Sequence, residues 1–180
     1  MKRMEGFSDP DKNIEQFELQ SGARVADFGV GTGFYALAAA RRVGDAGRVY
    51  CLDIQKDLLK RLQDSAARFK LDNIEVVWTD LEKAGGSNLA DQSVDAVIVV
   101  NLLFQIEDKN TFVAEVARVL KPTGKVLLVD WADAFGGLGP QAQSIVTKEN
   151  GTALFQSKGF TQLKEINAGQ HHWGIIFKKQ

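Results

Sequence analysis

Short apolar runs alternate along the chain with longer segments in which apolar residues recur every three or four positions. The runs are typical of buried strands and the longer segments of helices with one buried face. The runs predict strands over residues 24–28, 48–53, 74–78, 93–101 and 125–131. The spacing predicts helices over about residues 11–19, 34–43, 55–69, 109–120 and 148–158. Strands that alternate with single helices form a parallel sheet, in which ligands lie beyond the C-terminal ends of the strands.

The C-terminal part of the chain breaks this alternation. Two further strands are predicted over residues 160–167 and 172–178, and residues 168–171 between them are too few for a parallel crossover. The last strand must therefore run antiparallel. We predict an α/β fold, a Rossmann-like doubly wound sheet of seven strands, as a single domain of residues 1–180 with a short helical cap segment at 1–22.

The first strand runs into a glycine-rich turn that contains Asp27, Gly29, Gly31 and Gly33. Glycine allows positive φ, and without a Cβ it lets a ligand approach the backbone closely. The residues that follow are strong helix formers, so the turn leads to a helix N-terminus with unpaired N–H groups. We therefore expect a polar ligand at this turn, although a tight turn that binds nothing would use the same residues.

Two nucleotide ligands fit the turn. Gly31, Gly33 and Ala36 match the dinucleotide fingerprint, and Asp53 lies about 20 residues on, where a ribose-binding acid is expected. This would make the chain a nicotinamide-dependent oxidoreductase. Asp27 opposes that interpretation, because its carboxylate would repel a pyrophosphate but could hold a cationic amino group.

The spacing Asp27-x-Gly29-x-Gly31-x-Gly33 resembles motif I of the class I S-adenosyl-L-methionine (SAM) methyltransferases. The resemblance covers about residues 20–180. Within that superfamily the chain is most similar to small-molecule methyltransferases related to the ubiquinone/menaquinone biosynthesis C-methyltransferases. Residues 112–124, and Val129-Asp130-Trp131 followed by Gly139-Pro140, carry that closer likeness.

The resemblance implies SAM as the methyl donor and S-adenosylhomocysteine (SAH) as the product. It implies that Asp27, Gly29, Gly31 and Gly33 hold the methionine moiety, and that Asn101 faces the methionine amine.

For the nucleoside, the resemblance implies that Asp53 accepts the two ribose hydroxyls and that Ile54 lies against the adenine. Asp80 would accept the adenine amino group, with Leu81 alongside. Asp27, Asp53 and Asp80 each end or follow a predicted parallel strand, so they should meet at one edge of the sheet.

Methyl transfer from a sulfonium needs alignment, desolvation and, for some acceptors, a base. His171 and His172 lie on the turn between the last two strands, at the expected pocket face, and a histidine base would make the rate rise through a pKa near 6 to 7. The alternative for each histidine is a side chain that is only packed or solvated at a strand end. Because no base is obvious in the sequence, the chain could also be a SAM-binding protein without catalysis. Asp130 and Glu107 follow strands and could orient an acceptor.

Other residues near the expected pocket have simpler interpretations. Asp108 is better explained as a helix N-cap than as a substrate ligand. An apolar wall near the methyl group could be formed by Phe7, Phe104, Trp131 and Phe135, although aromatic residues are often core.

Composition and motifs limit the classes of methyl acceptor that we expect. The 22 basic and 23 acidic residues nearly balance, and residues 101–104 lack the Asn/Asp-Pro-Pro-aromatic signature of amino-group nucleic-acid methyltransferases. We therefore expect a small-molecule acceptor and no nucleic acid. The one cysteine, Cys51, excludes a multi-cysteine metal site and argues against an arsenic methyltransferase, so no metal is expected.

No stretch has the length of an apolar membrane span or the pattern of a secretory signal, so we expect a cytoplasmic protein without a membrane span. The predicted cap of about twenty residues is smaller than that of larger relatives. A cap of this size predicts one of two arrangements. Either the pocket is open, or the protein is a homodimer in which a second subunit supplies the cap.

Overall fold

The computed structural model describes residues 8–135 and 139–180, so the prediction on Phe7 lies outside the described residues. The strands are β1 (Arg24–Phe28), β2 (Arg48–Asp53), β3 (Ile74–Trp78), β4 (Val94–Val100), β5 (Leu120–Trp131), β6 (Phe160–Ile166) and β7 (His172–Lys179). The helices are α1 (Pro10–Phe17), α2 (Phe34–Val43), α3 (Lys56–Phe69), α4 (Lys109–Val119) and α5 (Lys148–Gln156), with 3-10 turns η1 (Leu103–Gln105) and η2 (Ala142–Ser144).

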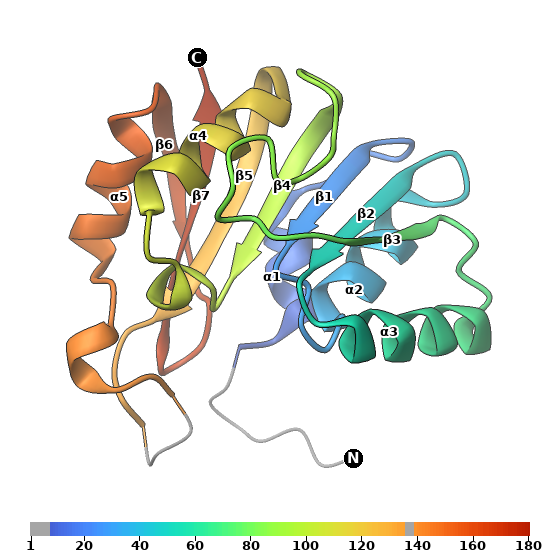
Figure 1. Ribbon diagram of the computed structural model, residues 1–180, viewed down its shortest axis with the longest axis horizontal. Coiled ribbons are helices and arrows are strands. Elements are labelled where there is room, and N and C mark those ends of the chain that lie inside the picture. The colour runs from blue at the N-terminus through green and yellow to red at the C-terminus, as the bar shows by residue number, and fades with distance from the viewer. Residues whose placement is uncertain (1–7, 136–138) are drawn as a thin grey trace.

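The seven strands form one sheet in the order β3-β2-β1-β4-β5-β7-β6 (Figure 1). Neighbours among the first five strands pair in parallel. The strand β7 lies antiparallel to both β5 and β6. This arrangement confirms the predicted doubly wound sheet with a reversed last strand.

Helices cover both faces of the sheet. Apolar side chains of α4 and α5 pack on one face, and those of α1, α2 and α3 pack on the other (Figure 1). Burial on both faces explains why β4 is an almost continuous apolar run rather than an alternating one. No helix in the described part of the chain is long and apolar enough to cross a membrane.

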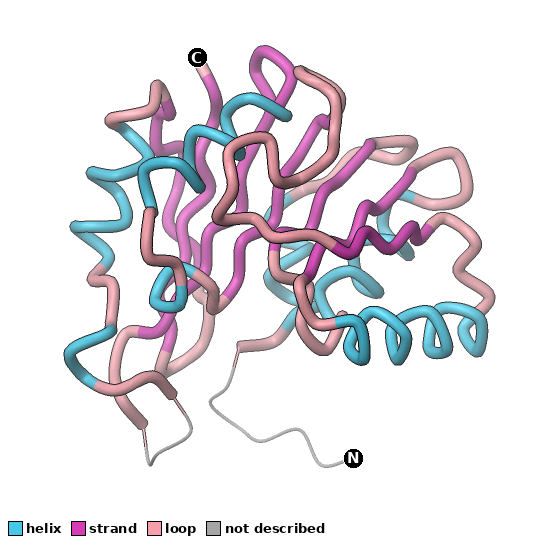
Figure 2. Tube along the Cα trace, viewed as in Figure 1, coloured by secondary structure: helices cyan, strands magenta, loops and turns pink. Residues whose placement is uncertain are grey.

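The parallel strands β1, β2 and β4 end at the same edge of the sheet, where loops gather (Figure 2). Capping residues fix the starts of two helices near this edge. Asp9 accepts a hydrogen bond from the backbone N–H of Lys12 and precedes Pro10 at the first helical position. Asp108 accepts one from Thr111 at the start of α4, which confirms its role as an N-cap.

Several predicted boundaries differ from the structure, and two of these differences have a clear physical cause. The helix α1 ends at Phe17, because Glu18 takes a left-handed conformation with φ of 57° and its N–H bonds to the carbonyl of Glu15. The strand β5 begins at Leu120 rather than Lys125, because Leu120 already pairs with Val94.

Candidate functional site

A cavity of about 490 Å³ lies at the C-terminal edge of β1, β2 and β4. Most of the residues predicted to bind the cofactor line it, together with one predicted catalytic residue. They are Asp27, Gly29, Gly31, Asp53, Ile54, Asp80, Leu81, Asn101 and His172. Gly33, Asp130 and His171 are not among its lining residues.

The three glycines of the turn have different roles, although all have positive φ. A Cβ at Gly29 would come within 2.7 Å of the Leu102 side chain, and one at Gly33 within 2.6 Å of Leu62. A Cβ at Gly31 would meet nothing nearer than 3.9 Å, so this glycine faces open space at the cavity. Gly33 instead lets the start of α2 pack closely against Leu62 of α3.

Asp27 carries an incompletely bonded carboxylate into the cavity. Its side chain is only 2% exposed, and Oδ2 has no hydrogen-bond partner among the described residues. Burial, with a further contribution from the negative charge of Asp53, raises the pKa of Asp27 to about 7. A ligand ammonium at this point would complete the hydrogen bonding of the carboxylate and restore its charge.

Asp53 ends β2 beside the glycine turn. Its Oδ2 accepts the backbone N–H of Gly31 at 2.9 Å, and its Oδ1 accepts that of Gln55 at 2.8 Å. Each carboxylate oxygen has a further lone pair, so the group can still accept hydroxyl hydrogen bonds. The next residue, Ile54, is 60% exposed at the cavity and offers an apolar surface.

Asp80 and Asn101 are two further polar residues of the lining. Asp80 is half-buried, with Oδ1 accepting the N–H of Glu82 at 3.1 Å and Oδ2 lying 3.4 Å from Lys83 Nζ. Asn101 has a φ of 53°, and its buried Oδ1 has no partner within the described ranges. Such an orphaned amide oxygen is suited to a donor from a ligand.

His172 and Trp131 also line the cavity, with ring centroids 4.4 Å apart. Both ring nitrogens of His172 are buried and have no partner among the residues described. Burial, with a contribution from His171, lowers the pKa of His172 to about 4. His172 is therefore neutral near pH 7, and its pKa lies below the range of 6 to 7 that a histidine base would show.

The neighbouring His171 points elsewhere. Its Nδ1 lies 2.9 Å from a carboxylate oxygen of Asp133, and its ring stacks on Phe135 with centroids 3.9 Å apart. Among the aromatic residues predicted to line the pocket, Trp131 does so, whereas Phe104 and Phe135 do not.

Asp130 lies next to the cavity rather than in it. Its carboxylate is fully buried and accepts the backbone N–H groups of Leu103 at 3.0 Å and Trp131 at 2.8 Å. Burial raises the pKa of Asp130 to about 6. These contacts fix the start of η1 and the end of β5. The geometry therefore suits a residue that holds the wall of the cavity in place rather than one that contacts a ligand. Glu107 also lies outside the lining, and its backbone N–H donates to Glu82.

Sequence reasoning missed the wall that α1 and α2 supply. Tyr35 lines the cavity, its hydroxyl accepts from Asn13 Nδ2 at 2.6 Å, and it is hydrogen-bonded to Ser8. Asn13 is buried beside Ile14, so a polar residue on the apolar face of the predicted first helix was the available signal. Other unpredicted lining residues include Thr32, Phe34, Thr79, Glu82 and Gln105.

The charge of the lining is one-sided. Asp27, Asp53, Asp80 and Glu82 line the cavity, and no lysine or arginine is among its described lining residues. This distribution favours a ligand that carries positive charge and opposes a pyrophosphate.

Comparisons with known proteins agree with this geometry. A family model described as a methyltransferase domain matches residues 26–128. The chain is 34% identical over 120 residues to the ubiquinone/menaquinone biosynthesis C-methyltransferase UbiE of Pseudomonas putida, covering 66% of this chain and 46% of that enzyme. It is 28% identical over 120 residues to the demethylmenaquinone methyltransferase of a Geobacillus species, covering 67% of this chain and 50% of that enzyme.

The chain spans about half the length of these curated relatives. The crystal structure of a SAM-dependent methyltransferase from Aquifex aeolicus has the same fold, with a TM-score of 0.86 and 24% identity over 97% of this chain and 91% of that one. These findings confirm the family resemblance indicated by the motifs. The chain belongs to the methyltransferase-domain family.

Proposed function

We propose that the chain binds SAM in the 490 Å³ cavity and transfers its methyl group to a small-molecule acceptor, with SAH as the product. One observation carries the proposal: Asp27, Asp53, Asp80 and Asn101, from four neighbouring strand ends, meet in one cavity in which Asp27 Oδ2 and Asn101 Oδ1 lack partners. The two acceptors without partners, Asp27 Oδ2 and Asn101 Oδ1, suit an ammonium. The carboxylates of Asp53 and Asp80 suit ribose hydroxyls and an adenine amino group.

The residues divide the cavity into three parts. Asp27, the turn around Gly29 and Gly31, and Asn101 would hold the methionine end, and Gly33 would act by packing the turn. Asp53 and Ile54 would hold the ribose and one face of the adenine, and Asp80 and Leu81 its amino edge. When bound, SAM would supply a methyl group for in-line attack by an electron pair of the acceptor, with the electrons of the carbon–sulfur bond leaving on the sulfur of SAH.

We propose that His172 hydrogen-bonds the acceptor, since its two ring nitrogens are buried at the cavity without partners among the described residues. A neutral imidazole can donate from one nitrogen and accept at the other. Trp131 would confine the acceptor against this ring. Asp130 would act by fixing η1 and the end of β5, and His171 would have no direct role.

Calorimetric titration with SAM, SAH and NAD tests the ligand. We expect SAM and SAH to bind and NAD not to bind, because four acids line the cavity. Binding of NAD without SAM would instead support a nicotinamide-dependent oxidoreductase. Screening metabolite extracts with methyl-labelled SAM then tests catalysis, and SAM binding without any labelled product would support a binding protein that lacks turnover.

The remaining assignments are also proposals. A formal net charge of −1 supports an acceptor that is not a nucleic acid, and a single sheet of seven strands supports one domain. We place the protein in the cytoplasm. For assembly we propose a homodimer in which a second subunit covers the open side of the cavity, and light scattering with and without SAH tests it.

A further inference from the structure

The segment between β3 and β4 connects the cavity to a distant helix. Thr79, Asp80, Leu81 and Glu82 at its start line the cavity. In Figure 1 the rest of this segment crosses the face of the sheet covered by α4 and α5 and reaches α4. The conformation of this segment therefore determines where Asp80 and Leu81 lie.

The far side of the segment is tied directly to its cavity side. A Cβ at Gly86 would lie 2.1 Å from the carbonyl oxygen of Asp80, so the chain folds back tightly on itself here. The Thr79 hydroxyl donates to the carbonyl of Gly86, and Asn88 Nδ2 donates to Thr79 Oγ1 at 3.2 Å. Movement of residues 86–88 would thus move Thr79 and Asp80.

Ser87 attaches this side of the segment to α4. Ser87 is fully buried, its backbone N–H donates to Glu115 Oε1 at 3.0 Å, and its hydroxyl donates to the same oxygen. Glu115 is 3% exposed. A buried carboxylate is costly unless it is paired and hydrogen-bonded.

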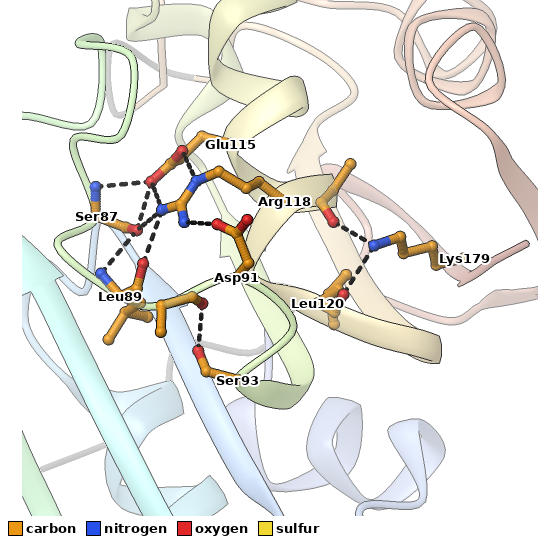
Figure 3. Close-up of polar contacts among 10 residues, drawn as sticks. Ser87, Leu89, Asp91, Ser93, Glu115, Arg118, Leu120 and Lys179 are labelled. Atoms are coloured by element: carbon orange, nitrogen blue, oxygen red, sulfur yellow. Dashed lines mark hydrogen bonds and ion pairs between the residues drawn. The ribbon is translucent and has the colours of Figure 1, made fainter.

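Arg118 supplies that pairing and adds further contacts to the segment. Its Nε and Nη2 donate to the two oxygens of Glu115 at 2.8 and 2.7 Å. Nη2 also donates to the Leu89 carbonyl at 2.8 Å, and Nη1 pairs with Asp91 (Figure 3). Burial acts to raise the pKa of Glu115, but hydrogen bonds from Arg118 and Ser87 outweigh it and lower the pKa to about 2. The pair therefore stays charged at neutral pH.

We propose that Glu115 and Arg118 are positioning residues for nucleoside recognition: from outside the cavity they hold residues 87–91, and through Thr79 they set the position of Asp80 at the adenine amino group. This rests on the proposed function, in which Asp80 accepts that amino group. If the pair only stabilised the fold, its loss would lower the fraction of folded protein. If it positions Asp80, its loss should also change how well the protein distinguishes one purine ligand from another.

Lys179, the last residue of β7, provides a matched control because it contacts the same helix. Its Nζ donates to the carbonyls of Ala117 at 2.6 Å and Leu120 at 2.8 Å, at the C-terminal end of α4 (Figure 3). No hydrogen bond joins Lys179 to residues 79–91 in the described structure. Lys179→Met should therefore loosen the helix without moving Asp80.

The experiment compares two probes, SAH and S-inosylhomocysteine, in which an oxo group replaces the adenine amino group. We expect the wild type to prefer SAH by about 10-fold or more, because the oxo group leaves the Asp80 carboxylate facing an acceptor. Arg118→Met should reduce this ratio at least about threefold, Arg118→Lys less, and Lys179→Met not at all. Lower stability alone would weaken both probes equally and leave the ratio unchanged.

Each outcome decides between the two proposals. An Arg118→Met protein that keeps the wild-type ratio would overturn the positioning role while leaving the proposed function in place. A wild type that does not bind SAH would overturn the proposed function itself, and equal binding of the probes would overturn the role of Asp80 and with it this inference. Circular dichroism checks the fold, and if Arg118→Met does not fold, Arg118→Lys and Ser87→Ala decide the same question.

Discussion

Gly31 donates its backbone N–H to Oδ2 of Asp53 across 2.9 Å, which joins the turn after β1 to the end of β2. The backbone N–H groups of Gly29 and Val30 also donate to the carbonyl of Leu52 on β2. Asp53 therefore shapes the turn in addition to facing the cavity. Any substitution at this position tests both roles together.

Two substitutions of Asp53 should affect SAM binding and stability to different degrees. Asp53→Ala should weaken SAM binding by roughly 1.5–3 kcal/mol, since a charged acceptor of ribose hydroxyls is lost, and should also lower the melting temperature because two N–H groups lose their partner. Asp53→Asn keeps one acceptor oxygen of the same shape and should lose less of both. Calorimetry with SAH and thermal unfolding measure these effects, and unchanged affinity in a folded Asp53→Ala protein would remove Asp53 from the ribose site.

The sequence predicted the strands β1, β2 and β3 to the residue, because each is a short apolar run with glycine, aspartate or asparagine within two residues of its ends. The same pattern placed Asp27, Asp53 and Asp80 at one edge, since parallel strands end on the same side. Both results depend only on local sequence and on the general geometry of parallel sheets.

Contacts between distant segments were not predictable in this way. Which of two adjacent histidines faces the cavity depends on the pleat of β7, and the pairing of β7 with β5 puts His172 opposite Trp131. The bond between Asn13 and Tyr35 depends on how α1 packs on α2, and the contact of Ser87 with Glu115 joins residues 28 positions apart. No periodicity in the chain encodes these pairings.

The raised pKa of Asp27 predicts pH-dependent binding. An ionised carboxylate holds an ammonium better than a neutral one, so SAH affinity should increase as pH rises from 5.5 to 7.5 through the pKa of about 7. At still higher pH the ligand amine itself loses its proton, and affinity should fall again. Asp27→Asn should bind SAH more weakly and show no increase over the lower range. A parallel pH dependence in wild type and variant would exclude Asp27 as the amine ligand.

The raised pKa of Asp27 has the opposite effect on stability without ligand. A carboxyl whose pKa is about 7 when folded and about 4 when unfolded makes the native state bind more protons between these values, so the free energy of unfolding falls as pH rises through this window. Asp27→Asn removes this loss and should stabilise the unliganded protein at pH 8 by a few kcal/mol, because each tenfold change in proton affinity is worth about 1.4 kcal/mol. Denaturant titrations at pH 5 and pH 8 measure the difference. A variant less stable than wild type at pH 8 would contradict the burial effect.

The glycines of the turn should respond differently to alanine. Gly33→Ala places a Cβ 2.6 Å from buried Leu62 at a φ of 80° and should destabilise by about 1–3 kcal/mol. Gly31→Ala has room in the structure, so it should cost only about 1 kcal/mol from backbone strain but reduce SAH affinity about 10-fold or more, because the methyl group occupies ligand space. Unfolding and calorimetry on both variants test this contrast. Equal losses of affinity in the two folded proteins would contradict the assignment of Gly31 to the ligand and Gly33 to packing.

The last prediction concerns His172, and NMR can test it directly because the chain has only two histidines. The ring of His172 is buried between Trp131 and the cavity, and its pKa of about 4 keeps it neutral through the physiological range. In His171→Gln the single remaining imidazole should therefore show no titration between pH 6 and 8. A midpoint between 6 and 7 would contradict the burial effect and restore His172 as a base.

Kinetics then distinguishes acceptor binding from proton transfer at His172. Once labelled SAM has identified an acceptor, His172→Gln should raise its KM by about 10-fold, the worth of one buried hydrogen bond, while the shape of kcat against pH above 6 stays as in wild type. The matched variant His171→Gln should change both constants less than about twofold, because its ring contacts Asp133 and Phe135 outside the cavity. If His172→Gln instead lowers kcat about 100-fold or more and removes a pH-dependent rise, the imidazole takes part in proton transfer. If it changes neither constant, His172 only fills space beside Trp131, and the acceptor must be held by other lining residues such as Tyr35 or Gln105.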